Sequence, residues 1–273
     1  MTAEAEVSSQ PVLLDQLQGG VLTLTLNRPE RLNALNAALI QALVAAVGRA
    51  AADSDCRAIL ITGAGRGFCS GADLADRAVK PGAARPDLGQ SLDKGLNPLI
   101  RAIRNLAKPV VCAVNGAAAG AGANLALACD IVLAAKSAQF LQAFVRIGLI
   151  PDAGGTFYLP RLIGGARARA LMMLAEPIGA EQAQASGMIY RAVADEDLMG
   201  EARIVAERLA GGATRALGLI KRALAASPCN SLDAQLDLER DLQREAGFGD
   251  EFSEGVQAFL DKRPPDFRGK RGA

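Results

Sequence analysis

The feature that most constrains the fold is a pattern that occurs twice: an apolar strand, a glycine-rich loop and the start of a helix. The first copy is the predicted strand 58–62 followed by the loop 63–74. The second copy is the predicted strand 109–114, the loop 115–124 and a helix of small residues that runs to Cys129. Repeated strand, loop and helix units are typical of a mixed α/β fold. We therefore predict an α/β core.

The flanking segments extend this core and then change character. Gly19 and Gly20 supply the positive φ of a tight hairpin between strands 12–18 and 21–27, and Asn36 caps a helix over 37–51. Shorter elements are a strand over 131–135, a turn over 151–156, a helix over 180–186 and a strand over 188–193. After it the predicted helices are about 195–209, 214–226, 232–246 and 252–262. The pattern predicts a core over residues 1–195 and a helical region over 196–273, with segment 75–97 as a candidate lid.

Charge and composition exclude several classes of function. Lys and Arg number 30 and Asp and Glu 29, which leaves a net charge of +1 and no basic footprint for nucleic acid or a membrane surface. The chain has no histidine, which excludes Ser–His–Asp and Cys–His catalysis and imidazole metal sites within it. We expect no metal. Acid–base chemistry must then use a carboxylate, Lys, Tyr or Cys.

The cysteines favour a reducing compartment. There are five, with no C-x-x-C pair, and scattered unpaired thiols are typical of a cytoplasmic protein. Residues 1–10 are polar and acidic and show no apolar signal region. Segment 109–129 carries no formal charge, but it is rich in Ala and Gly rather than Leu, so it predicts a buried strand and helix, not a membrane span.

The glycine loops do not fit a nucleotide site. Phe68 and Leu125 stand where the third glycine of G-x-G-x-x-G is required, and no P-loop motif exists. Backbone N–H groups exposed at such helix starts can instead converge on one oxygen as an oxyanion hole. The alternative is that the glycines only permit tight turns and close packing, and the glycines alone favour that alternative.

Four motifs together give a more specific indication: residues 27–36, 67–74, 113–125 and 129–131 resemble the enoyl-CoA hydratase/isomerase (crotonase) family, over about residues 12–267. The resemblance implies a spiral of repeated β-β-α units with a helical C-terminal trimerisation region. It also implies an acyl-CoA thioester substrate with no separate cofactor, and homotrimers that often pair as dimers of trimers. By resemblance, the N–H groups of Ala72 and Ala121 are the oxyanion donors.

The chain departs from the hydratases of this family at the positions that activate water. The two glutamates of the hydratases match Asn124 and Phe144, and neither side chain is a useful proton acceptor. Asp152 stands where the hydratases have glycine, and it resembles the base of isomerases and of aryl-CoA enzymes such as 4-chlorobenzoyl-CoA dehalogenase. Burial beside apolar neighbours is expected to raise the pKa of its carboxyl. The alternative is a turn aspartate bonded to its own backbone.

Within the family, segments 147–157 and 233–241, with Asn124, most resemble the ring 1,2-epoxyphenylacetyl-CoA isomerases of phenylacetate breakdown, also regarded as Δ3,Δ2-enoyl-CoA isomerases. We therefore predict an acyl-CoA isomerase in which Asp152 moves a proton beside a held thioester, on a ring-derived or unsaturated acyl group. The alternatives are an enoyl-CoA hydratase, a dehalogenase or hydrolase with Asp152 as nucleophile, and a non-catalytic CoA-binding protein.

The remaining predicted site residues are contacts. Asn124 is placed with the catalytic group and is expected to line the pocket with a modest effect on rate; alternatively its amide is satisfied at the helix start. The resemblance places Phe259 and Lys262 at the nucleotide part of CoA, often in a neighbouring subunit, although Lys262 fits a solvated helix end equally well. Arg28 is a weaker CoA candidate. The other expected substrate contacts are Phe68, Gly71, Asp73, Gly120, Phe144 and Arg31, of which the aromatic residues are also typical of a core.

Overall fold

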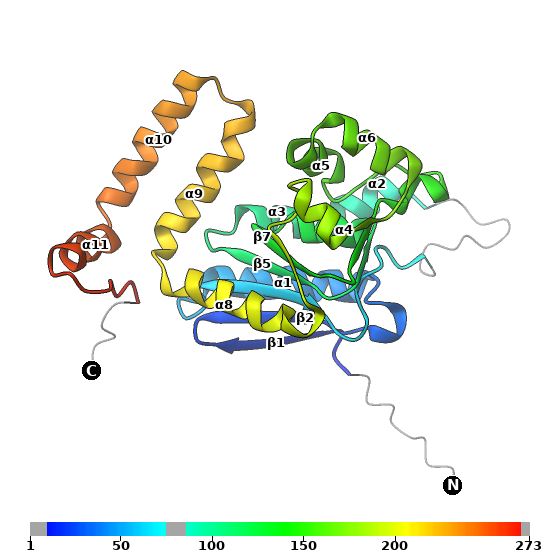
Figure 1. Cartoon of the computed structure of the whole chain (residues 1–273), viewed down its shortest axis with the longest axis horizontal. Coiled ribbons are helices and arrows are strands. Elements are labelled where there is room, and N and C mark those ends of the chain that lie inside the picture. Colours follow the sequence, from blue (N-terminus) through cyan, green and yellow to red (C-terminus); the bar gives the residue numbers. More distant parts are fainter. Residues whose placement is uncertain (1–9, 75–85, 269–273) are drawn as a thin grey trace, which may run out of the picture.

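The structure is a computed structural model that describes residues 10–74 and 86–268. Its main sheet has the strand order β1-β2-β3-β5-β7-β10 and is parallel except for the β1–β2 pair (Figure 1). The strands are β1 (Leu13–Gln18), β2 (Val21–Leu26), β3 (Ala58–Gly63), β5 (Val110–Val114), β7 (Ile131–Ala135) and β10 (Arg191–Val193). The predicted hairpin is confirmed, with Gln18 paired to Val21 across Gly19 and Gly20 at φ 61° and 85°.

A second, smaller sheet runs beside the first. Its strands, in the order β4-β6-β8-β9, are β4 (Gly67–Cys69), β6 (Ala117–Ala119), β8 (Gln139–Leu141) and β9 (Ile178–Gly179). Each long strand β3, β5 and β7 is followed at once by one short strand of this sheet. The chain thus winds through two sheets in repeated β-β-α turns, which is the predicted α/β spiral. The sequence did not predict the short strands, because a strand of two or three residues is too short to carry a period-2 signal.

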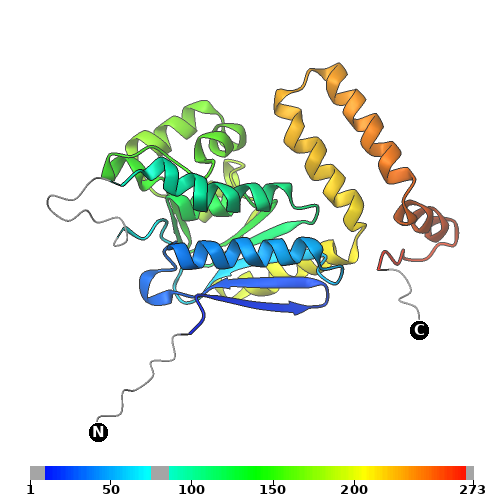
Figure 2. The same cartoon turned by 180° about the vertical axis from the view of Figure 1, so that it is seen from behind.

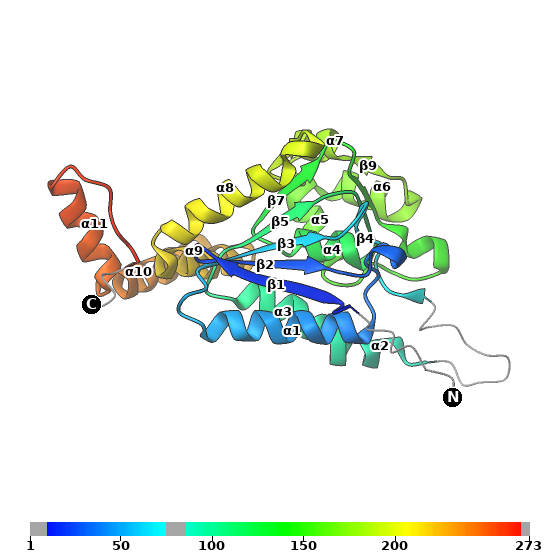
Figure 3. The same cartoon turned by 90° about the horizontal axis from the view of Figure 1, so that it is seen from below.

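Helices lie on both faces of the main sheet and bury its central strands (Figures 2 and 3). α1 (Ala37–Ala52) begins where the Asn36 side chain accepts a hydrogen bond from the Leu39 N–H at 2.9 Å, as predicted. α8 (Leu198–Gly211) packs against β3, β5 and β7. Strands β3 and β5 are buried along their whole length, which explains their unbroken apolar sequences.

The remaining helices include predicted ones, whose ends are shifted by a few residues, and others for which no helix range was predicted. They are α2 (Leu88–Ser91), α3 (Asn97–Asn105), α4 (Ala121–Leu127), α5 (Gly155–Ile163), α6 (Gly165–Leu174), α7 (Ala180–Ala185), α9 (Thr214–Ala226), α10 (Leu232–Gly247) and α11 (Asp250–Leu260). The predicted strand 188–193 is confirmed only over Arg191–Val193. Part of the predicted lid, residues 75–85, lies outside the described residues, and Leu88 onward is helical. No helix among the described residues is long and apolar enough to span a bilayer.

The helices α9, α10 and α11 stand away from the core (Figures 1 and 2). Because α8 packs on the main sheet, the segment that stands apart begins with α9. The division of the chain after residue 195 into two units stays a prediction.

A partly buried charge cluster fastens α9 to the core. The Lys221 ammonium lies 2.8 Å from the Asp130 carboxylate and donates to the carbonyls of Ile103 and Lys108 at 3.2 and 2.9 Å. The same carboxylate accepts the Val110 N–H at 2.8 Å. The side chains of Lys221 and Asp130 are 10% and 18% exposed, so the pair is shielded from water and geometrically fixed.

Replacing Lys221 tests this attachment. We expect Lys221→Met to lower the free energy of unfolding by about 3 kcal/mol, because Asp130 then keeps a poorly solvated charge without its main partner. The matched control is Lys136→Met, whose ion pair with Glu181 is 57% and 71% exposed; its expected loss is below about 1 kcal/mol. Urea denaturation measures both, and equal losses would contradict the assignment.

Candidate active site

Two backbone loops from neighbouring strands touch at one edge of the small sheet. β4 pairs with β6, so the loop after β4 lies beside the loop after β6. Gly71 has φ +93°, and a Cβ built on it would lie 2.7 Å from the Ala119 carbonyl oxygen and 3.4 Å from the Ala121 nitrogen. Glycine is therefore required at this position by both conformation and space. The close approach places the N–H groups of Ala72 and Ala121 on adjoining backbone segments.

The N–H of Ala72 is turned away from its partner strand. Leu35 forms a parallel bridge with Ala72, in which the Leu35 N–H donates to the Gly71 carbonyl at 2.7 Å and the Asp73 N–H donates to the Leu35 carbonyl at 3.0 Å. In this pattern the two flanking residues make the hydrogen bonds, which leaves the N–H of the central residue on the other side. Within the described ranges, the Ala72 N–H has no protein acceptor.

The N–H of Ala121 opens helix α4. Gly120, at φ +51°, is the residue before the helix, and its own N–H donates to the Leu141 carbonyl at 2.8 Å. The first N–H groups of a helix lack an acceptor one turn earlier. For the Ala121 N–H, too, the described part of the chain provides no protein acceptor. Helix α4 is buried along its full length, so the position of this group is set by the core.

Asp152 lies on a tight turn between a 3-10 helix (Ala143–Ile147) and α5. Ala153 and Gly154 adopt left-handed φ values of 49° and 81°, and the Gly155 N–H donates to the Asp152 carbonyl at 2.9 Å. A left-handed alanine costs roughly 1–2 kcal/mol, so surrounding contacts must hold this turn. Asp152 is half-buried, and its Oδ1 atom is shielded from solvent.

Asn124 joins the turn to helix α4. Its Nδ2 donates to the Asp152 carbonyl at 2.8 Å, and its Oδ1 accepts from Gln142 Nε2 at 2.8 Å. The sequence predicted that Asn124 lines the pocket. Asn124 has no exposed surface, so in this structure it does not line an open pocket. Its amide is satisfied inside the protein, and the side chain acts on the main chain of Asp152 rather than facing a ligand.

Sequence reasoning did not identify Gln142 as part of this site. The residue is 3% exposed and lies directly after strand β8. A single glutamine between Leu141 and Ala143 is typical of a solvated loop. Only its contact with Asn124 in the folded chain shows that it is a buried hydrogen-bond donor. No local signal in the sequence could have found it.

The predicted aromatic contacts occupy different environments. Phe144 is almost fully buried, and a Cβ on Gly120 would lie 3.5 Å from its ring, so the ring forms an apolar wall beside the start of α4. Phe68 has no exposed surface and belongs to the hydrophobic core. The position of Phe68 therefore does not support the expected contact with substrate, because the whole ring is packed in the core.

Asp73 and Arg28 form an ion pair beside the Ala72 loop. Their charged atoms are 2.9 Å apart, and the side chains are 11% and 14% exposed. The Arg28 guanidinium also donates to the Ala34 carbonyl, so it is occupied inside the protein rather than presented to a phosphate. Asp73 is likewise placed to support its loop, while Arg31 is exposed.

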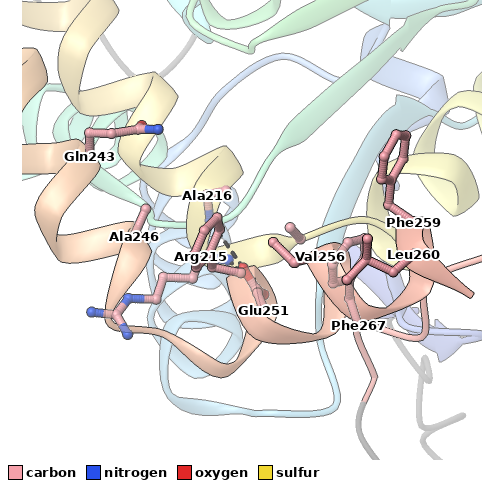
Figure 4. Close-up of a pocket in the computed structure, with 12 residues that line it drawn as sticks. Arg215, Ala216, Gln243, Ala246, Glu251, Val256, Phe259, Leu260 and Phe267 are labelled. Carbon is pink, nitrogen blue, oxygen red and sulfur yellow. Dashed lines mark hydrogen bonds between the residues drawn. The ribbon is translucent and has the colours of Figure 1, made fainter.

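Phe259 and Lys262 lie far from the site within one chain. They belong to the α11 end of the molecule, whereas Asp152 precedes α5 at the opposite end (Figure 1). Phe259 is 83% exposed, and Lys262 follows the helix with φ +54°. Among the described residues, an apolar pocket of about 470 Å³ lies here between α9, α10 and α11 (Figure 4). None of Ala72, Ala121, Asn124 and Asp152 lines this pocket.

The thiols near the site are poor proton carriers. Complete burial raises the pKa of the Cys69 thiol to about 12, and its Sγ donates to the Asn33 carbonyl at 3.2 Å. Burial also raises the pKa of Tyr158, which packs against Gly154. Both groups stay protonated near neutral pH, and the carboxylate of Asp73 is paired with Arg28, which leaves Asp152 as the acid–base candidate that the sequence proposed. No group of His, Cys, Asp and Glu in the described residues could hold a metal ion.

Comparison with known proteins agrees with this architecture. A family model described as enoyl-CoA hydratase/isomerase matches residues 16–270. The chain is 53% identical to the 1,2-epoxyphenylacetyl-CoA isomerase of Escherichia coli, with 94% of this chain and 98% of that protein covered. It is 51% identical to a Rhodobacter capsulatus protein named "Probable enoyl-CoA hydratase", with 93% and 97% covered. The crystal structure of an enoyl-CoA hydratase from Bacillus anthracis superimposes with a TM-score of 0.89 at 31% identity, covering 95% of this chain and 100% of that one.

The chain therefore belongs to the enoyl-CoA hydratase/isomerase family, and it is an enzyme of that family. The predicted family and the predicted crotonase-type fold are both confirmed.

The contact between the two loops can be tested with a pair of glycines. Gly71 and Gly148 both have positive φ, but only Gly71 has backbone atoms where a Cβ would go. We expect Gly148→Ala to lower the free energy of unfolding by about 1 kcal/mol through backbone strain alone, and Gly71→Ala by about 3 kcal/mol or more. Urea denaturation compares the two variants. Similar losses would mean that the loops do not touch as described.

Proposed function

We propose that this protein is an acyl-CoA isomerase in which the N–H groups of Ala72 and Ala121 hold the thioester oxygen and Asp152 moves the proton. The observation that carries the proposal is the hydrogen bond from Asn124 to the Asp152 carbonyl. It ties the turn that bears Asp152 to the helix that begins with Ala121. This hydrogen bond thereby fixes the proposed base relative to the proposed carbonyl-binding amide of Ala121.

The chemistry follows from the charges involved. Removing a proton from the acyl chain places negative charge on the thioester oxygen, and two backbone donors stabilise that enolate or dienolate. Loss of one such donor raises a barrier by about 2.7–4 kcal/mol. The Asp152 carboxylate accepts the proton from one carbon and returns it at another, or the ring of a ring-derived substrate rearranges. CoA is part of the substrate, and the proposal includes no other cofactor and no metal.

Two side chains favour isomerisation over hydration. The apolar Phe144 ring lies beside the start of α4, and both polar ends of the Asn124 amide are occupied by protein groups. Neither residue offers a carboxylate to position and deprotonate water. A hydratase therefore lacks its second acid–base group here, whereas an isomerase needs one carboxylate that both takes and returns a proton.

The substrate class is a ring-derived or unsaturated acyl-CoA. The 53% identity to a 1,2-epoxyphenylacetyl-CoA isomerase supports an acyl group of the epoxyphenylacetyl type, and Phe144 offers it an aromatic wall. This chemistry belongs to phenylacetate or fatty-acid breakdown. The second candidate is an enoyl-CoA hydratase, which the name of the Rhodobacter capsulatus relative favours.

Asp152→Asn is the direct test of the base. We expect it to lower the turnover of an epoxyphenylacetyl-CoA or a 3-enoyl-CoA substrate by about 10²–10⁴-fold, because the amide cannot accept the proton. Binding of the thioester is expected to stay largely intact. The matched control is Asp237→Asn on the exposed face of α10, with unchanged turnover. A loss below tenfold would reject Asp152 as the base.

The same assay separates the alternatives. Appreciable hydration of crotonyl-CoA by the wild-type protein would favour a hydratase. A covalent adduct on Asp152 seen by mass spectrometry would favour a hydrolase or dehalogenase. Thioester binding without any turnover would favour a non-catalytic CoA-binding protein.

We also propose a homotrimer, or a dimer of trimers, in which Phe259 and Lys262 of one subunit reach the CoA bound by the next. The support is the exposed apolar surface of the helices that stand away from the core, including Leu224, Leu236 and Phe252. Clusters of exposed apolar side chains of this kind are typical of interaction surfaces.

A charge on this surface tests the assembly. We expect the wild-type protein to sediment at three times the mass of one chain or a multiple of that, and Leu224→Glu on α9 to shift it toward the monomer, since burying an unpaired carboxylate is unfavourable. Leu17→Glu on the hairpin, 41% exposed, is the control and should leave the mass unchanged. A monomeric wild-type protein in analytical ultracentrifugation is the contrary result.

A further inference from the structure

We propose that Gln142 is a positioning residue for Asp152 and acts through Asn124. The inference rests on the proposed function, since it assigns Asp152 the role of the base. It adds a residue whose amide donates a hydrogen bond to Asn124. Three segments that are separate in the sequence meet in this relay: the residue after β8, helix α4 and the turn before α5.

The relay consists of two short hydrogen bonds. Gln142 Nε2 donates to Asn124 Oδ1 at 2.8 Å, and Asn124 Nδ2 donates to the Asp152 carbonyl at 2.8 Å. Gln142 is 3% exposed and Asn124 is fully buried, so both side-chain amides are shielded from water. Hydrogen bonds in such surroundings fix the orientation of both amides.

The direction of the relay is set at its Asp152 end. A backbone carbonyl can only accept, so Asn124 must present its Nδ2 there and its Oδ1 on the opposite side. Gln142 must then present Nε2 to that oxygen. Turning either amide over would bring two acceptors or two donors face to face. The two amides are therefore ordered as a pair, and each is required for the orientation of the other.

Gln142 bears a penalty for this order. Its Oε1 is buried and has no hydrogen-bond partner among the described residues. A buried acceptor without a partner is unfavourable, and an apolar side chain of the same shape would avoid it. The contact that offsets this penalty is the donation from Nε2 to Asn124. The glutamine is thus explained by the group it orients and not by its own hydrogen bonding.

The turn that receives the relay has little freedom to move. A Cβ on Gly155 would collide with Asn124 Nδ2, so the backbone of the turn lies directly on the amide. Ala153 is held at a φ of +49°, which is unfavourable without outside support. On the other side, Ala121 and Asn124 lie one helical turn apart on α4. The relay therefore fixes the turn bearing the base relative to the amide that would hold the substrate oxygen.

Loss of this alignment should slow proton transfer without weakening thioester binding. A displacement of about 1 Å at the reacting groups can lower a rate by about 10²-fold. The proposed thioester contacts are made by the two loops and do not include Gln142. We therefore expect changes in kcat with little change in KM, and a larger substrate deuterium isotope effect on kcat, because proton transfer becomes rate-limiting.

The test is a double-mutant cycle with Gln142→Met and Asn124→Leu, which remove the amides but keep their approximate size. Asn124→Leu should lower kcat by about 10–100-fold and Gln142→Met by about 5–30-fold, each with KM within about twofold of wild type. Because Gln142 acts through Asn124, the double variant should be no slower than Asn124→Leu alone. The control is Gln139→Met. Gln139 is the exposed first residue of β8, and this variant should leave kcat unchanged.

Further variants keep the result decisive if packing fails. If Gln142→Met does not fold, Gln142→Leu also lacks the donor and adds no charge, so it should show the same fall in kcat. Crystal structures of the variants should show the Asp152 carbonyl displaced from its wild-type position. This readout does not depend on activity.

The outcomes separate the two proposals. Unchanged turnover in Asp152→Asn rejects the proposed function. If Asp152→Asn loses turnover but Gln142→Met keeps kcat within twofold, or if the losses in the cycle simply multiply, the relay is wrong and the base assignment stands.

Discussion

The hydrogen bond between Asn124 and the Asp152 carbonyl is the interaction on which the rest of the site depends. It joins a buried helix to a strained turn, and each supplies one part of the proposed chemistry. The Ala121 N–H is placed by α4, and α4 is placed by the core. Asp152, in contrast, lies on a turn with left-handed residues that has no regular structure of its own. The position of the Asp152 turn is therefore set by its hydrogen bond to helix α4.

Close backbone approach explains why the site is built from small residues. The loops bearing Ala72 and Ala121 meet at Gly71, where a Cβ would strike the Ala119 carbonyl. Gly155 plays the same part at the second junction, where the turn lies on the Asn124 amide. Larger residues would separate the donors from the acid. Gly71, which lies in one of the glycine-rich loops that indicated an α/β repeat, is thus also the residue that allows the two loops to approach closely.

The sequence predicted the main-sheet strands and most helices because their signals are local. The Asn36 cap and the buried strand β3 are examples, since capping chemistry and apolar runs act within a few residues. The short strands of the second sheet and the role of Gln142 were not predictable, because both depend on partners distant in the chain. Asn124 was identified, but as a pocket residue. Only the fold shows that its amide is turned inward.

The same geometry links two departures from the hydratase pattern that are separate in the sequence. Asn124 stands where the hydratases resemble one another in having a glutamate, and Asp152 where they have a glycine. In this fold the side chain at 124 donates to the main chain of residue 152. A glutamate carboxylate at 124 has no donor for that carbonyl and would add a negative charge beside the turn of Asp152. An amide at 124 supplies the donor and carries no charge. The asparagine at 124 therefore supports the main chain of Asp152 in a way that a glutamate at the same position would not.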